Sequence, residues 1–102
     1  MITDEYLSAV DLASDIRDKK LAPSEVVEET IRAIDERNPS INAFVYTNYD
    51  EAREKAKAED DKLARGEASG AFFGVPTAAK DFIPGIPGWP GTFGGIKALS
   101  HM

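Results

Sequence analysis

The chain changes character at Gly66, and this change limits the kinds of structure that it can form. Before Gly66 the sequence is rich in charged residues, and its apolar residues recur with helical spacing. From Gly66 to Gly95 it holds most of its glycines and prolines and few charges. Glycine and proline interrupt helices and favour turns and extended segments. The sequence therefore predicts a helical segment over residues 1–66, followed by a strand and a Gly/Pro-rich loop over residues 67–102.

Two helices are predicted in the first forty residues or so. The first runs from about residue 9 to Lys19, because Ser8 and Asp11 form a capping-box pattern ahead of apolar residues at helical spacing. The second begins at Pro23, since proline suits the first turn of a helix, where its missing N–H costs nothing. It should end at Asn38-Pro39, because proline disfavours helical geometry in the residue before it.

A third helix is predicted after Asn48, whose side chain is a good N-terminal cap. This helix should end near Arg65, with Gly66 as its stop. The stretch Ile41 to Tyr46, which precedes it, is short, apolar and partly β-branched. Its pattern fits an extended strand or a buried connector, and periodicity alone does not decide between the two.

The best strand candidate runs from Phe72 to Phe82 and is interrupted by a glycine and a proline. Side chains alternate along an extended segment, so Lys80 would share one face with Pro76 and Ala78. Two interpretations of Lys80 follow from these residues. Its ammonium group reaches solvent, as in most lysines, or it is desolvated among small apolar neighbours and its pKa is lowered. The local residues by themselves favour the surface lysine.

Composition excludes several classes of function. At 102 residues with 42% hydrophobic residues, the chain is long enough for one small domain with a real core. Lys and Arg total 12 against 18 Asp and Glu, so the net charge of −6 disfavours nucleic acid as a partner. A membrane span needs a run of about 18 apolar residues, and no such run occurs. The N-terminus also lacks the basic-then-apolar order of a signal peptide. We expect a soluble, cytoplasmic protein.

The residues that usually hold metals or cofactors are scarce. There is no cysteine, which excludes a disulfide framework, a thiolate nucleophile and a thiolate metal site. His101 is the one histidine, so a zinc site would lack its usual ligands. The glycines after Gly85 lack the spacing of a dinucleotide-binding loop, and no phosphate-binding Gly-x-x-x-x-Gly-Lys run occurs. We expect no metal and no cofactor.

The segment around Lys80 is similar to a motif of a known enzyme family. The run Gly74 to Asp81, with sequence GVPTAAKD, resembles the Gly-apolar-Pro-x-x-x-Lys-Asp segment of the amidase signature family. The upstream chain follows the family order as well, with a helix opening near Pro23, then Asn38-Pro39, the run Ile41 to Phe44, and a helix of alanines and charges. The resemblance covers roughly residues 5 to 97.

The resemblance implies an α/β fold, in which a central mixed sheet is covered by helices and this chain forms the helical start and first core strand. It implies an amidase with a Ser-cisSer-Lys triad, in which Lys80 is the catalytic base and the substrate is a small-molecule amide. Downstream residues set the choice of substrate, so simple carboxamides, fatty amides, peptide amides and transamidation of charged tRNA all stay open. In the family both serines come from Gly/Ser-rich segments well downstream of the lysine. Gly95 stands where the family often has a serine, and it supplies no hydroxyl there.

Residues 1–102 are therefore expected to be the N-terminal part of a single, truncated amidase domain, inactive alone and completed by its own C-terminal portion. The serines of this chain are scattered singly in predicted caps and loops, where capping or solvent contact is their expected role. They are Ser8, Ser14, Ser24, Ser40, Ser69 and Ser100.

The alternative is a non-catalytic helical interaction module. The second predicted helix carries Val27, Ile31 and Ile34 on one face and charged residues on the other. In this alternative the apolar face would bury against a partner, and Lys80 would be only a surface charge.

Overall fold

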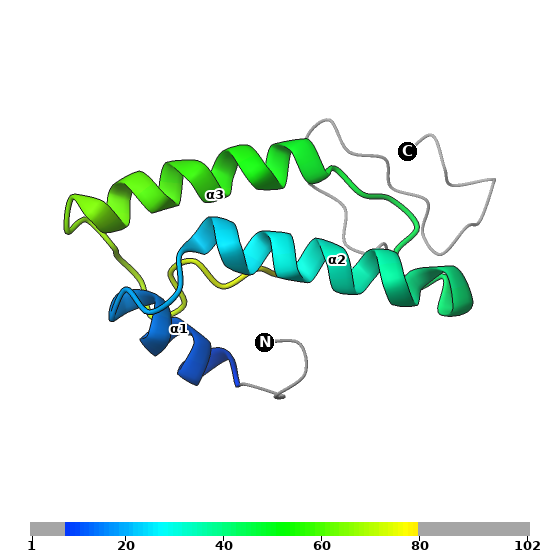
Figure 1. Ribbon diagram of the computed structural model, residues 1–102, viewed down its shortest axis with the longest axis horizontal. Helices are drawn as coiled ribbons and strands as arrows, with labels where there is room; N and C mark the ends of the chain where they lie inside the picture. Colours follow the sequence, from blue (N-terminus) through cyan, green and yellow to red (C-terminus); the bar gives the residue numbers. More distant parts are fainter. Residues whose placement is uncertain (1–7, 80–102) are drawn as a thin grey trace.

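The computed structural model describes residues 8–79, which form three helices and the segment that follows them. The helices are α1 (Ala9–Arg17), α2 (Pro23–Ile41) and α3 (Tyr49–Ala64). Figure 1 shows α2 and α3 side by side and running in opposite directions, with α1 below the start of α2. No helix within residues 8–79 has the length and apolar character needed to cross a bilayer.

The three predicted helix starts are confirmed, and those of α1 and α3 carry side-chain caps. The Ser8 Oγ accepts a hydrogen bond from the Asp11 N–H at 3.1 Å, and α1 begins at the next residue. At α3 the Asn48 Oδ1 accepts from the Glu51 N–H at 3.2 Å, while the Asn48 amide donates to the Glu51 carboxylate at 3.0 Å. Such bonds satisfy N–H groups that have no partner within a first helical turn. The caps therefore define where both helices begin.

The predicted end of the second helix is wrong, because α2 continues through Pro39 to Ile41. The helix stops at Asn42, which has a left-handed backbone with φ of 49° and donates its N–H to the Asn38 carbonyl at 2.6 Å. The Asn38 side chain also bonds both backbone groups of Phe44, at 2.8 and 2.9 Å. The bias against helical geometry before proline is overcome where such local bonds hold the last turn. Residues 42–48 then form a connector and no strand.

The other helix ends lie close to their predicted positions. α1 ends at Arg17, and the positive φ of 61° at Lys19 turns the chain away from the helix. α3 ends at Ala64, and Gly66 follows with φ of 74° and donates its N–H to the Leu63 carbonyl at 3.1 Å. Glycine adopts this left-handed geometry without steric cost, which makes Gly66 the predicted helix stop.

The predicted strand from Phe72 to Phe82 does not form in the part of it that the structure describes. Residues 71–74 are a turn, in which the Phe73 N–H bonds the Gly70 carbonyl at 3.4 Å and the Val75 N–H bonds the Phe72 carbonyl at 3.0 Å. Residues 75–79 are irregular, and within residues 8–79 no other segment pairs with them. A strand requires a neighbour to bond its N–H and C=O groups, so an extended sequence pattern is insufficient.

The core lies where α1, the start of α2, the end of α3 and the turn meet. Leu12, Ile16, Val26 and Leu63 are buried in one cluster, and Leu21, Ala68, Phe73 and Val75 pack against it. On α2, Val26 is buried at 1% exposure, and Pro23 is fully buried as well. The residues of the predicted apolar face are buried to different degrees, since Ile31 is buried while Val27 and Ile34 are half-buried. α2 thus uses two apolar faces, one toward α1 and one on the side of α3.

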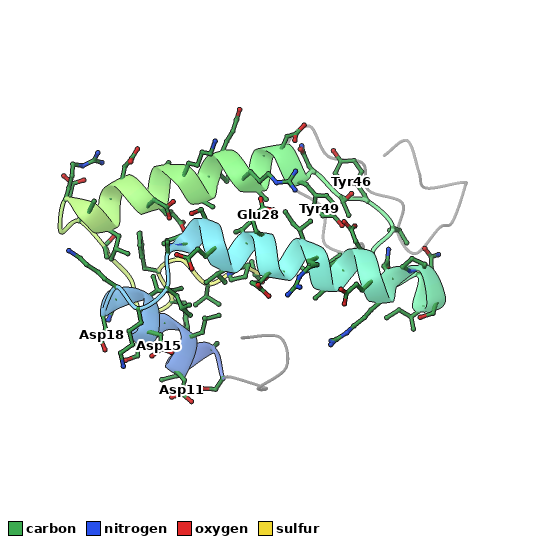
Figure 2. The ribbon with its side chains drawn as sticks, viewed as in Figure 1. Asp11, Asp15, Asp18, Glu28, Tyr46 and Tyr49 are labelled. Carbon is green, nitrogen blue, oxygen red and sulfur yellow. The ribbon has the colours of Figure 1, made fainter. Side chains whose placement is uncertain are left out.

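An ion pair joins the outer sides of α2 and α3. The Arg53 guanidinium of α3 donates to both carboxylate oxygens of Glu28 on α2, at 2.6 and 3.3 Å. Figure 2 shows Glu28 between the two helices. The hydrogen bond from Arg53 holds the pKa of Glu28 below its ordinary value, and the same bond raises the pKa of Arg53. The pair is exposed, so it specifies how the helices align more than it stabilises them.

Residues 1–102 by themselves should be marginally stable, because several large apolar side chains of the described part face solvent. Val10, Ile41, Val45 and Phe72 are each more than half exposed, at 67, 67, 61 and 57%. We expect the purified chain to show helical circular dichroism with a broad, weakly cooperative thermal transition, or to associate. A sharp two-state transition from a clean monomer would contradict this prediction.

The helical signal of the chain should weaken at acid pH partly through Glu28. Its pKa is lowered in the folded state, so the unfolded chain takes up a proton at higher pH than the folded chain does. The contribution is complete above the ordinary glutamate pKa of about 4.3 and is lost as pH falls through the lower folded value. Glu28→Gln should lower the thermal midpoint at pH 7, and the gap from the parent should narrow as pH falls below about 4.3. Glu54→Gln, on the same helix as Arg53, is the control; an equal effect from it would refute the assignment to Glu28.

Candidate functional site

The predicted catalytic residue Lys80 lies outside the described residues, directly after the last of them. The structure shows the segment that leads to it, Gly74 to Ala79. In Figure 1 this segment is yellow and passes behind α2 from the side of α1. The assignment of Lys80 as a catalytic base therefore stays a prediction.

The segment that leads to Lys80 begins inside the core. Gly74 is buried, and Val75 packs against the core cluster of Leu12, Ile16, Val26 and Leu63. Pro76 is half-buried, and Thr77, Ala78 and Ala79 are exposed. The chain thus leaves the core over about three residues, and its small side chains come to the surface just ahead of Lys80.

A hollow of about 370 Å³ lies beside this segment. Its walls come from α2, α3, the connector between them, and Gly74 to Ala79. Much of its lining is apolar, including Val27, Ile31 and Ile34 of α2 and Ala52 and Ala56 of α3. Phe44, Tyr46, Thr47, Asn48, Tyr49, Val75, Pro76 and Ala78 also line it. The segment that leads to Lys80 thus forms one wall of a largely apolar depression.

Polar groups gather at the end of the hollow where α3 begins. Figure 2 shows Tyr46 and Tyr49 there, and the Tyr49 hydroxyl donates to the Asp35 carboxylate of α2 at 3.1 Å. Partial burial raises the pKa of Tyr49, and the bond to Asp35 raises it further, since a nearby carboxylate opposes the phenolate. Tyr49 is therefore a neutral donor near pH 7 and not a base. Its role is to join the two helices.

The described residues hold no nucleophile activated by a base. Ser8 caps α1, and the Ser40 hydroxyl donates to the Arg37 carbonyl at 2.9 Å. The Ser24 backbone N–H donates to Asp60 at 3.0 Å, which ties the start of α2 to α3. The remaining serines of residues 8–79, Ser14 and Ser69, are exposed. The capping role predicted for Ser8 is confirmed, and the described serines show no catalytic arrangement.

Acidic side chains of the described part do not converge on a metal site. Figure 2 shows Asp11, Asp15 and Asp18 along the outer side of α1. Within residues 8–79 no group of three or more metal-ligating side chains lies close enough together to hold an ion.

Comparison with known proteins identifies the family. The model of the amidase family matches residues 25–100. One component of the glutamyl-tRNA(Gln) amidotransferase of Staphylococcus haemolyticus (strain JCSC1435) is 38% identical over 78 residues, which are 76% of this chain and 16% of that protein. The corresponding component of Mesorhizobium japonicum (strain LMG 29417 / CECT 9101 / MAFF 303099) is 42% identical over 68 residues, which are 67% of this chain and 13% of that protein.

A solved structure agrees with these sequence matches. A bacterial aryl acylamidase of the amidase signature enzymes is 48% identical, with a TM-score of 0.85 over 91% of this chain and 19% of its own. The chain spans about a sixth of the length of the curated relatives it matches. The match of the family model over most of the chain and the structural agreement lead to one conclusion: the chain belongs to the amidase signature family.

Proposed function

We propose that this chain supplies the catalytic lysine, Lys80, to an amidase that hydrolyses a carboxamide C–N bond through a Ser-cisSer-Lys triad. The observation that carries the proposal is the family match over residues 25–100, which includes the segment GVPTAAKD and its lysine. The same match favours an enzyme over a non-catalytic helical interaction module.

In the proposed mechanism Lys80 acts in its neutral form. The nucleophilic serine attacks the amide carbonyl and passes its proton to the cis-serine, which passes its own proton to the lysine amine. A free lysine has a pKa of about 10.4, so keeping it neutral near pH 7 costs about 4 to 5 kcal/mol. Burial of the amine or a nearby positive charge must lower the pKa of the lysine by the corresponding amount. Ala78 and Ala79 are themselves exposed, so the cover over Lys80 would come from the rest of the domain.

The two serines and the backbone N–H groups that stabilise the oxyanion belong to segments that the family places downstream. We propose that residues 1–102 are the helical start of an α/β domain with a central mixed sheet, and that the chain enters this sheet after Gly74. The match to the aryl acylamidase structure supports this arrangement. The apolar hollow between α2, α3 and Gly74 to Ala79 fits a surface that the remainder of the domain covers.

We propose a small-molecule amide as the substrate. The identity of 48% to an aryl acylamidase exceeds the 38 and 42% found with the two amidotransferase components, and it extends over more of the chain. The net charge of −6 also disfavours direct contact of this part with a nucleic acid. An anilide is therefore the first substrate to test.

The decisive variant is Lys80→Ala in a chimera that joins residues 1–102 to the downstream part of the bacterial aryl acylamidase. Because loss of the base stops proton removal from the serine pair, we expect anilide hydrolysis to fall at least about 100-fold with the fold intact. Lys80→Arg should fail equally, since a guanidinium is effectively never deprotonated. Lys57→Ala, an exposed lysine of α3, is the matched control and should keep parental turnover. A folded Lys80→Ala chimera with more than a few per cent of parental turnover would remove Lys80 from the mechanism.

Residues 1–102 by themselves should hydrolyse neither amides nor esters, and adding the downstream portion, in trans or in cis, should restore activity. An isolated lysine near its ordinary pKa of about 10.4 is almost wholly protonated at pH 7, so it gives water negligible base assistance. The test is an assay of the purified chain with a chromogenic anilide and a simple amide. Turnover that survives repurification and disappears in Lys80→Ala would point to a different, self-contained site.

A further inference from the structure

Gly74 lies in an unusually tight position at the start of the segment that leads to Lys80. Its backbone is left-handed, with φ of 81°. A Cβ atom added there would lie 3.1 Å from both the Cδ1 and Cγ2 atoms of Ile16 and 3.3 Å from the Cγ atom of Pro23. The absence of a side chain therefore lets the chain pass directly over the first two helices.

The neighbours of Gly74 have little room to yield. Ile16 is fully buried at 0% exposure, and Pro23 is also buried and is fixed in the first turn of α2. The turn that delivers Gly74 is held by its own backbone bonds and by the Arg17 guanidinium, which donates to the Gly70 carbonyl. A side chain at position 74 would consequently displace the Gly74 backbone outward, and not its neighbours.

We propose that Gly74 is a positioning residue for the reaction: its seat on Ile16 and Pro23 fixes where the segment that presents Lys80 leaves the core. This inference rests on the proposed function, because it assigns the lysine a catalytic task. Val75 and Pro76 continue the anchored part, and three residues, Thr77 to Ala79, connect Pro76 to Lys80. The four residue steps from Pro76 to Lys80 span at most about 14 Å when extended. A displacement of the backbone at position 74 is therefore passed to Lys80 through few intervening residues.

Gly74→Ala tests the proposal in the same chimera. We expect kcat for the anilide to fall about tenfold or more with KM unchanged, because misplacing a catalytic group by about 1 Å costs up to about 100-fold. Gly66 offers a matched control, since it has a left-handed backbone, with φ of 74°, and open space where a Cβ would lie. Gly66→Ala should carry a similar backbone cost and keep parental kcat.

A second comparison isolates the contact with Ile16. Ile16→Val removes the Cδ1 atom, so Gly74→Ala should cost a smaller factor in kcat when it is introduced beside Ile16→Val than alone. If the Gly74→Ala chimera does not fold, Ile16→Val with Gly74 kept decides instead. It loosens the seat while leaving most of the core volume, and a lower kcat at unchanged KM supports the proposal, whereas parental kcat overturns it.

The outcomes separate this proposal from the proposed function. A folded Gly74→Ala chimera with parental kcat, beside an inactive Lys80→Ala chimera, would overturn the positioning role and leave the catalytic lysine in place. An equal loss of kcat in Gly66→Ala and Gly74→Ala would also overturn it, because backbone strain alone would then explain the effect. Parental activity in Lys80→Ala would refute the proposed function itself.

Discussion

The structure depends on the burial of Ile16. This side chain of α1 is fully buried with Val26 of α2 and Leu63 of α3, and it also lies against Gly74. Burying an isoleucine side chain is worth about 1.5 to 3 kcal/mol, a large share of the stability available to a domain of this size. Because all three helices and the segment after them meet at this one residue, its packing determines how the helical part and the approach to Lys80 are joined.

Away from Ile16 the helices are held by weaker contacts. The α2 and α3 pair is tied by two exposed contacts, Glu28 with Arg53 and Tyr49 with Asp35, and by a part-buried hydrogen bond from the Ser24 N–H to Asp60. Exposed pairs of this kind contribute little free energy but favour one alignment of the helices. The alanines that α3 turns toward α2 add little apolar area, so a hollow stays between the helices and the segment Gly74 to Ala79. One anchored end and one open apolar side suit a part of a larger domain.

In the proposed enzyme the catalytic groups would come from two different parts of the chain. The base would come from a segment anchored on the helices, while the nucleophile, the bridging serine and the oxyanion donors would come from the rest of the domain. Catalysis by such a triad depends on hydrogen-bond distances between its members. The anchoring of Gly74 and the covering of the hollow would then both contribute to geometry at the lysine, although neither supplies a reacting atom.

The sequence by itself determined the three helices and the family. Caps at Ser8 and Asn48 act within one turn, and the motif around Lys80 is a run of adjacent residues. Both can therefore be recognised from the sequence without a structure. Two local predictions failed: α2 runs through Pro39 because Asn38 and Asn42 bond its last turn, and residues 72–79 form no strand because nothing in the described part pairs with them. Lys80 itself lies outside the described residues. Only the tertiary structure showed that Val26 is buried more deeply than Val27 and that Gly74 sits on Ile16 and Pro23. These features depend on contacts between residues far apart in the chain, which no local pattern records.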